Sequence, residues 1–507
     1  PPGLTIGDPV TGGADNSLLY IGSGGVLSSD LYFDGSKLGV GVPSPSYCVD
    51  VAGDVNAAGN LYGYLARVSE PGTNATIVGD ITGNARGAGA LDIQSARSVT
   101  TMVASGLCST AYGQNNIASG DYSAAFGYQN VAPTAHSMAT GVCSEAIGSG
   151  STASGYRAKS CGDYSIAIGF GAVATGQRSA AIGVGTNAFT DTSTASGYAA
   201  QAYGLNSTSV GYVACSCGIS STAIGALSAA CGDQSSAAGF CNFATGCNSS
   251  ALGSSNIALG SLDSAVGYGN VACRNEASTA IGSLNVASAS GASALGRANH
   301  AVNAFDTASG YYNTASGCYS NAFGYINSTT GYNSSSFGNQ NTTSGYGATS
   351  AGRNNAASGS DSSAVGSNNV ASGCYSSAVG SGNAATCSSA SAFGKGNQAA
   401  DLGSTAVGAD NTASGYVSSA VGFNNIASGY SSSALGYVNF AICDNSSAIG
   451  RSNTASGLYT NASAIGSNNT VSADRGTAIG ACNVVSALLA SAVGSNNVAS
   501  GCYSSAV

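Results

Sequence analysis

Apolar side chains recur along this chain with a period of 14 residues. The tripeptide Ala364-Val365-Gly366 returns as Ala378-Val379-Gly380 and as Ala392-Phe393-Gly394, and its glycine fills one slot 28 times between Gly113 and Gly494. Only two breaks of register interrupt this series. Residues 14 apart drift around a helix axis, and a chain so rich in Gly, Ser, Asn and Thr forms helices poorly. The pattern therefore predicts an all-β chain in which 14-residue tiers stack as the turns of a β-solenoid.

The residues around the slot glycine alternate as they do in a strand. The residue before the glycine is Val, Ile, Leu, Phe or Tyr in 22 of the 28 tiers, and the residue before that is Ala in 25 of them. Successive side chains of a strand face opposite ways. One face of the strand is therefore small, as at Ala378 and Gly380, and the other is apolar and bulky, as at Val379. The pattern leaves open which of these faces lines the lumen.

A second half-turn follows in each tier, as in Asn369-Val370-Ala371-Ser372-Gly373. Pairs such as Asn368-Asn369 separate the two half-turns, and Asn and Gly tolerate the positive φ of tight corners. Each tier is therefore predicted to hold two short strands and two corners. At Gly155, Gly197 and Gly310 the main slot reads Ala-Ser-Gly, which suggests that the two half-turns exchange places there.

Both faces of the main strand are small or apolar, as expected of strands buried on both sides. A single coil would leave a long row of aliphatic side chains in water, so we expect identical coils to cover it around a rotation axis. The chain ends at Ala506-Val507, one residue before the next slot glycine. We therefore expect the array to continue beyond this end.

The first 110 residues do not follow the repeat. Strand-forming residues gather at Leu31-Tyr32-Phe33 and at Tyr47-Cys48-Val49-Asp50-Val51. The segments 38–46 and 49–55 resemble shaft segments of phage tail fibres. Residues 83–89 are rich in Gly and are interpreted as a flexible link. We therefore predict a β-rich shaft or attachment region over 1–110 and the repeat array over 111–507.

Composition excludes several functions. The chain has 507 residues with only 7% charged residues, a net charge of −9 and 13 Lys plus Arg, so a phosphate-binding surface for nucleic acid is not expected. No apolar stretch is long enough to insert in a membrane as a helix. Two His, no Cys-x-x-Cys pair and scattered acidic residues predict no metal site, no cofactor and no enzymatic activity.

Tyrosines recur at the corners in two neighbouring slots. They either contact a glycan or protein ligand or stack on one another between tiers. These candidates are Tyr122, Tyr164, Tyr319 and Tyr375 in one slot, and Tyr332, Tyr346, Tyr416 and Tyr430 in the slot before it.

Cys217 and Cys231 occupy the same slot in consecutive tiers, about 4.8 Å apart if the tiers stack as strands. This spacing permits a disulfide, and the alternative is that both thiols are small apolar fillers. Cys161 and Cys273 use this slot without such a neighbour. The sequons at Asn206, Asn327 and Asn341 are either glycan acceptors or chance products of an Asn-, Ser- and Thr-rich chain.

The unit Ser-x-Ala-x-Gly in a 14-residue tier resembles the head repeat of YadA-like trimeric autotransporter adhesins. Good copies are residues 221–225, 362–366 and 446–450. The resemblance implies a left-handed parallel β-roll, a homotrimer, an extracellular location, and adhesion to a glycan or protein of a host surface.

These observations favour a structural and adhesive fibre without enzymatic activity, on a cell surface or a virion. Two alternatives stay open: a subunit of an end-to-end extracellular filament, and a receptor-binding tail fibre of a phage or virus. A fibre-borne depolymerase would need a clustered acidic site, which the sequence does not show.

Overall fold

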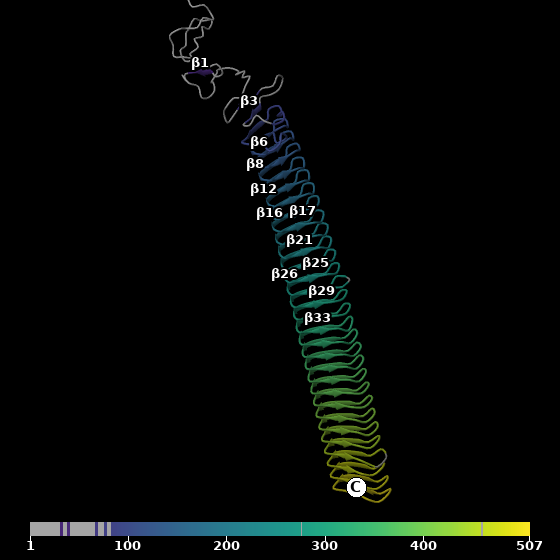
Figure 1. Cartoon of the computed structure of the whole chain (residues 1–507). Helices are drawn as coiled ribbons and strands as arrows, with labels where there is room; N and C mark the ends of the chain where they lie inside the picture. Colours follow the sequence, from purple (N-terminus) through teal and green to yellow (C-terminus); the bar gives the residue numbers. More distant parts are fainter. Residues whose placement is uncertain are drawn as a thin grey trace, which may run out of the picture. The chain divides into compact units, whose positions relative to one another are not determined.

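The computed structural model describes four short strands near the N-terminus and residues 83–274, 276–457 and 460–507. All regular elements in these parts are β-strands. The chain divides into two compact units, Pro1–Asn206 and Ser207–Val507. Within each unit the strands of successive tiers lie one above the next (Figure 1).

The first unit begins with two antiparallel pairs. β1 (Leu31–Phe33) pairs with β2 (Leu38–Val40), which confirms the strand predicted at Leu31, and β3 (Ala66–Val68) pairs with β4 (Thr76–Val78). The remaining residues that we likened to fibre-shaft segments, including 47–55, lie outside the described part of the chain. β4 then pairs in parallel with β5 (Leu91–Gln94) and opens the parallel ladder.

Two parallel ladders run through the rest of the first unit, one of long strands and one of two-residue strands. The long strands are β6 (Thr110–Gln114), β8 (Ala124–Tyr128), β10 (Met138–Val142), β12 (Thr152–Tyr156), β14 (Ile166–Phe170), β16 (Ala180–Val184) and β18 (Thr194–Tyr198). The short strands are β7 (Ile117–Ala118), β9 (Val131–Ala132), β11 (Glu145–Ala146), β13 (Lys159–Ser160), β15 (Val173–Ala174), β17 (Asn187–Ala188) and β19 (Gln201–Ala202).

The second unit repeats this tier. Its even-numbered long strands run from β20 (Thr208–Tyr212) to β60 (Ser491–Ser495), and its odd-numbered short strands run from β21 (Cys215–Ser216) to β61 (Val498–Ala499), before the final β62 (Ser505–Ala506). The pairing is parallel and places slot glycine beside slot glycine, as Gly366 of β42 (Ser363–Ser367) beside Gly380 of β44 (Ser377–Ser381). The predicted parallel β-solenoid with two strands in each 14-residue tier is therefore confirmed.

The strand register of the long-strand ladder is unchanged at every irregularity of the sequence. The ladder pairs Gly267 with Gly282 and Gly450 with Gly466, so the register of the long strands is the same on both sides of each insertion. The predicted exchange of half-turns is wrong: Gly155, Gly197 and Gly310 each pair with the slot glycine of the tier before. The exchange is unnecessary because only the outward-facing position of the strand has changed to Ser, while the lumen positions keep Ala and Gly.

The small face of the long strand lines the lumen. All 25 Ala of the slot two residues before the glycine are fully buried, and so are the three Ser that replace them, Ser209, Ser336 and Ser350. The bulky face points outward, and none of its 28 side chains is buried. Ala suits the lumen because the two ladders of a tier leave room for little more than a Cβ atom.

The slot glycine is required by its backbone and by its neighbour. Gly366 has φ of 116°, in a region that L side chains rarely adopt, and a Cβ atom there would lie 2.0 Å from the carbonyl oxygen of Gly380. The same positive φ occurs at all 28 slot glycines. Close stacking of one tier on the next therefore depends on the missing side chain.

A buried asparagine ladder runs through the second unit. Its members follow the slot glycine by three residues, and each donates its side-chain amide to the Oδ1 of the ladder Asn before it or to nearby backbone carbonyls. The ladder consists of Asn242, Asn256, Asn270, Asn285, Asn299, Asn313, Asn327, Asn341, Asn355, Asn369, Asn383, Asn397, Asn411, Asn425, Asn439, Asn453, Asn469, Asn483 and Asn497. The corner itself is made by the residue before, such as Asn368 with φ of 57°.

Candidate functional surfaces

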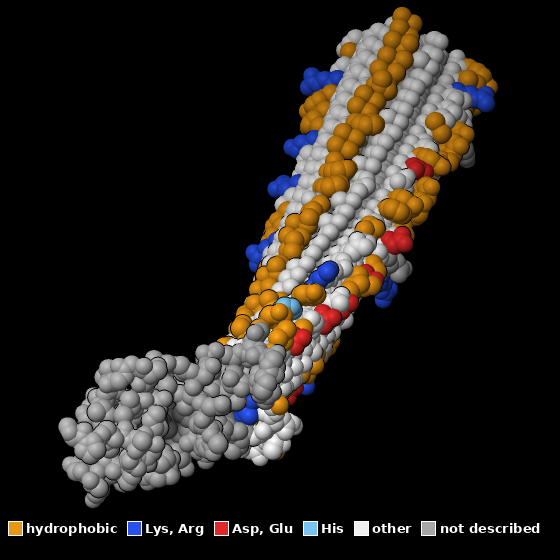
Figure 2. Space-filling view, turned by 90° about the horizontal axis from the view of Figure 1, so that it is seen from above, with side chains coloured by type: hydrophobic (Ala, Val, Ile, Leu, Met, Phe, Trp, Pro, Cys, Tyr) orange, Lys and Arg blue, Asp and Glu red, His pale blue; other side chains and the backbone are white. Residues whose placement is uncertain are grey.

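In each unit the outward apolar side chains before the slot glycines form a row along the tiers, which we call the aliphatic row. Ile224, Ile281 and Ile479 leave 45%, 40% and 41% of their surfaces exposed in a single chain. Figure 2 shows apolar side chains in a narrow row along the tiers, with rows of other side chains and backbone beside it. A row with 22 large apolar members in 28 tiers is larger than the scattered apolar residues of ordinary surfaces, which makes it a candidate interface.

Aromatic side chains form a second row on the same face of the long strands. They occupy the slot directly after the glycine, and some of those in adjacent tiers stack, as Tyr156 on Phe170 at 4.9 Å and Tyr311 on Tyr325 at 5.3 Å between ring centroids. This aromatic row consists of Tyr128, Tyr156, Phe170, Tyr198, Tyr212, Phe240, Tyr268, Tyr311, Tyr325, Phe423 and Tyr437. We did not select it from the sequence, although its constant position after the glycine was visible there.

The eight tyrosines selected from the sequence lie at the other corner of the tier, and all are exposed. Tyr332 stacks on Tyr346 and Tyr416 stacks on Tyr430 with interplanar angles of 6°. Because these rings cover one another's faces, they present mainly their edges and hydroxyl groups to a ligand.

The other four tyrosines differ in their neighbours. Tyr122 stacks on His136, and Tyr319 stacks on Phe305. Tyr164 and Tyr375 stack on no other ring in the described part of the chain, and they are the most exposed of the eight, at 64% and 66%. These two rings are therefore the strongest candidates for contact with a ligand.

Cys217 and Cys231 lie on the outer face of the short-strand ladder in consecutive tiers. The backbone N–H of Cys217 donates to the carbonyl of Ala230, which brings residues 217 and 231 side by side. Cys215, which we did not select, contacts Cys217 with 3.2 Å between the sulfur atoms. All three side chains are thiols in this structure.

The sequons separate into two environments. Asn327 and Asn341 belong to the buried asparagine ladder, where their side-chain amides donate to backbone carbonyls of their own and the next tier. Asn206 is exposed at a corner. The folded chain therefore offers only Asn206, among these three, to a modifying enzyme.

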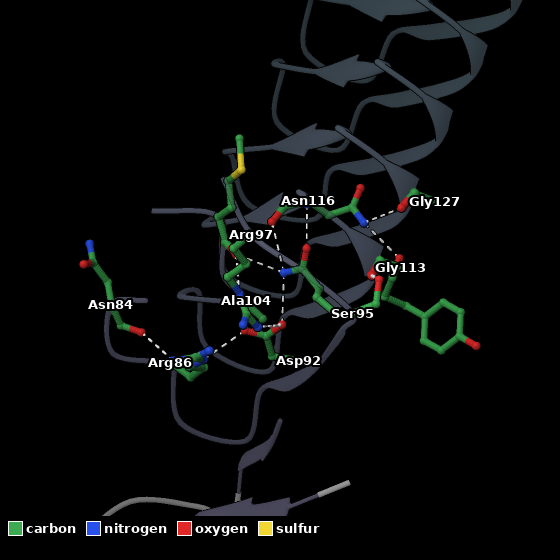
Figure 3. Close-up of polar contacts among 12 residues, drawn as sticks. Asn84, Arg86, Asp92, Ser95, Arg97, Ala104, Gly113, Asn116 and Gly127 are labelled. Carbon is green, nitrogen blue, oxygen red and sulfur yellow. Dashed lines mark hydrogen bonds and ion pairs between the residues drawn. The ribbon is translucent and has the colours of Figure 1, made fainter. Parts of the chain in front are cut away.

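The first tier carries a polar plug, which Figure 3 shows in close-up. Asp92 and Gln94 of β5 pair with Ala111 and Gly113, so polar side chains take the two lumen positions that are small in later tiers. The Asp92 carboxylate accepts from Arg86 Nε at 2.9 Å and from Arg97 Nη2 at 2.7 Å. Gln94 Oε1 accepts from the backbone N–H of Asn116 at 2.6 Å. A capped lumen end of this kind keeps a terminal tier soluble.

Residues 83–89, interpreted from the sequence as a flexible link, contribute to this first tier. The backbone N–H of Asn84 donates to Thr100, and that of Gly87 donates to Ala104. The packing of Gly87 against Gly106 leaves no room for a side chain at residue 87. This close packing, and not a need for flexibility, explains why the segment is rich in Gly. The division of the chain near residue 110 stays a prediction.

Within the described parts of the chain, no group of three or more His, Cys, Asp or Glu is arranged to hold a metal ion. The same parts contain no helix long and apolar enough to cross a membrane.

A comparison with protein families identifies the repeat. The model of the YadA head domain repeat matches residues 104–130, 118–142, 146–172, 162–186, 174–197, 191–214, 357–383, 413–438 and 460–481. The chain carries YadA head domain repeats. The matches fall in both units, and each lies within the ladders of long and short strands. No curated protein matches the chain.

Proposed function

We propose that this chain forms the shaft of an extracellular adhesive fibre in which three copies pack around a common axis and act without catalysis. The observation that supports this proposal is the outward-facing aliphatic row. Identical coils related by a rotation axis bury such a row completely, because every copy presents the same row at the same height. A homotrimer is the assembly that the likeness to YadA-like adhesins implies, and adhesion is the activity typical of surface fibres with these repeats.

The long strands supply the buried face in this assembly. Their outer face carries both the aliphatic row, which is large and apolar in 22 of 28 tiers, and the neighbouring aromatic row, whereas the outward position of the short strands is large and apolar in only 12 of 28 tiers. The short strands and the corners then face solvent and are available to a ligand. A host-surface glycan or protein is the partner that we propose for them.

The mass in solution tests the assembly. A trimer of the full chain has a mass of about 146 kDa, three times the chain mass of 48.7 kDa. The double variant Ile465→Asp/Ile479→Asp, which places charges in the aliphatic row, should dissociate the trimer. The matched control Val484→Asp/Val498→Asp places the same charges on short strands and should stay trimeric. A soluble wild-type monomer, or dissociation of the control alone, contradicts the proposal.

Binding to immobilised glycans and matrix proteins tests the adhesive role. The double variant Tyr164→Ala/Tyr375→Ala removes the two unstacked rings, and Tyr332→Ala serves as a control within a stack. Retention of the wild-type protein on such a surface, weakened by the first variant and not by the second, supports the proposal. A trimer that is retained on none of these surfaces rejects adhesion while leaving the assembly intact.

A further inference from the structure

Three cysteine side chains form a cluster on the outer face of the short strands in the second unit. Cys215 lies in β21, Cys217 directly follows that strand, and Cys231 directly follows β23 (Ala229–Ala230). Ser216, between the first two, is fully buried. Because alternate residues face opposite ways, Cys215 and Cys217 share the outer face, and their sulfur atoms lie 3.2 Å apart.

The backbone geometry decides which two of these thiols can be joined. A disulfide needs Cα atoms about 4.4–6.8 Å apart. Residues two apart in a strand are separated by roughly 6.6 Å, at the upper limit, whereas neighbours in adjacent strands lie about 4.8 Å apart. Cys217 and Cys231 are such neighbours, since Ser216 pairs with Ala230 in the ladder and the N–H of Cys217 donates to Ala230 at 2.8 Å.

The acidity of these thiols differs from that of catalytic and redox-sensing cysteines. Burial raises the pKa of the Cys231 thiol to about 11. It also raises the pKa of the Cys215 and Cys217 thiols above the usual value. Catalytic and redox-sensing thiols have lowered pKa values, because the thiolate is the reactive form. Attack of these thiols on a disulfide is therefore slow at neutral pH.

We propose that Cys217 and Cys231 form a disulfide that covalently joins two successive tiers, and that Cys215 remains a free thiol beside it. A low-molecular-weight disulfide such as oxidised glutathione is the oxidant. The Cys217 thiolate attacks one of its sulfur atoms and releases one small thiol, and the Cys231 thiolate then displaces the second. Two protein thiols become one disulfide, and the small disulfide is reduced to two thiols.

This cross-link does not depend on the assembly or on adhesion. It is expected in an oxidising compartment, where extracellular proteins acquire their disulfides. It also forms within one chain, so its presence or absence leaves the oligomeric state unaffected. The tiers on either side of the bond would resist separation, because the bond closes a short loop between them.

The test is differential alkylation of the full folded chain after incubation with oxidised glutathione. Free thiols receive a light iodoacetamide label, the protein is then unfolded and reduced, newly exposed thiols receive a heavy label, and peptides are identified by mass. Cys217 and Cys231 should carry the heavy label, and a cross-linked peptide should be found before reduction. Cys161 and Cys273, in the same slot without a cysteine in the adjacent tiers, should stay light in the same sample.

Three variants distinguish the possible pairs. Cys215→Ser should leave the heavy labels on Cys217 and Cys231 unchanged. Cys217→Ser and Cys231→Ser should each abolish the cross-linked peptide, and a heavy label left on the remaining cysteine should correspond to a glutathione adduct identified by its mass before reduction. All three should fold normally, because Ser occupies both of these outer slots in other tiers, as at Ser372. Light labels on all three cysteines of the wild-type chain, or heavy labels on Cys215 and Cys217 in Cys231→Ser, would overturn the proposal.

Discussion

Asn369 donates its side-chain amide to Oδ1 of Asn355 at 3.0 Å, and its backbone N–H donates to the same oxygen at 3.0 Å. The amide also donates to the carbonyls of Val365 and Gly380. One side chain thus joins its own tier to the tiers on both sides of it. The asparagine ladder is therefore a line of hydrogen bonds inside the solenoid, parallel to the two strand ladders.

The tandem Asn368-Asn369 gives a sharp test of this ladder. Asn369→Asp keeps the size of the side chain but removes the donors to three oxygen atoms and buries a charge. We expect a loss of about 3 kcal/mol or more in the stability of these tiers, from the buried groups left without partners. Asn368→Asp at the exposed corner should cost less than about 1 kcal/mol. Hydrogen exchange of the amides in β40 (Thr349–Arg353), β42 and β44 measures the loss of stability in both variants. Equal losses of stability in the two variants would contradict the role of the asparagine ladder.

The sequence predicted the tier of this fold and missed the ladder within it. Ala is nearly constant because it faces the narrow lumen, and Gly is constant because the backbones of adjacent tiers approach closely. Both constraints restrict the residue type at their positions strictly. The asparagine ladder restricts its position less strictly, because that slot also accepts Ser144, Ala158 and Thr186 in the first unit. We therefore interpreted the tandem Asn as a corner only. Its first residue is the corner, and its second is buried.

The slot glycine provides the second prediction. Gly366→Ala places a Cβ atom 2.0 Å from a backbone oxygen at φ of 116°, so β42 and β44 must separate. Gly382→Asn is the matched control, because a Cβ atom there meets nothing closer than 3.9 Å and Asn fills this corner slot at Asn368. We expect hydrogen exchange in β42 and β44 to accelerate at least tenfold in the first variant and to change little in the second. A thermally stable Gly366→Ala fibre with wild-type exchange would refute this reading.

The polar plug provides the third prediction. Asp92→Ala installs the residue found in later tiers but removes the acceptor for Arg86 and Arg97, both of which have largely buried side chains. Removing one partner of a buried ion pair costs about 3–5 kcal/mol. Asp121→Ala, which removes an exposed acceptor for the backbone N–H of Leu107, should cost about 1 kcal/mol. Protease sensitivity and hydrogen exchange of β5 and β6 compare the two variants.

The acidity of Cys231 gives a pH dependence in the reduced protein. Its pKa in the folded chain is about 11, above the usual value of 9.0. Below pH 9 the thiol is protonated in both the folded and the unfolded chain, and the contribution to stability is fully present. Between pH 9 and 11 the unfolded chain releases this proton first, so stability falls as pH rises.

Alkylation of Cys231 measures this shift directly. Its rate should rise about tenfold with each pH unit up to about pH 11, because only the thiolate reacts. A small-molecule thiol of ordinary pKa in the same solution should level off about two units earlier. Levelling of the Cys231 rate near pH 9 would show that burial does not suppress ionisation at this site.

The surfaces were harder to predict than the tier, for a physical reason. Outward positions tolerate almost any side chain, so the aliphatic row could be predicted only because 22 of its 28 members are large and apolar. The aromatic row has 11 such members among smaller and charged residues, and it did not stand out. The pair Cys217 and Cys231 was predicted from their common slot, whereas Cys215 was missed although it lies two residues before Cys217 and alternation places both on one face.

The last prediction concerns the volume of the lumen, which is filled in each tier by the side chain of the short strand together with the side chain four residues before the slot glycine. Val471 and Val485 replace the usual Ala of the short strand and are fully buried, and between them the slot that usually holds Ser contains Gly476. A Cβ atom on Gly476 would lie 2.8 Å from Cγ1 of Val471 and 2.9 Å from Cγ1 of Val485. The large Val side chains and the missing side chain therefore compensate each other.

Gly476→Ser should destabilise these tiers by about 1–3 kcal/mol, the usual cost of overpacking. In the background Val471→Ala/Val485→Ala, where the clashing methyl groups are absent, the same substitution should be neutral or stabilising. Hydrogen exchange of β58 (Thr477–Ala481) in the four proteins gives the coupling free energy, which is expected to exceed about 1 kcal/mol for residues in contact. An equal loss in both backgrounds would show that the two slots pack independently, and that Gly476 is present for some other reason than the volume of its neighbours.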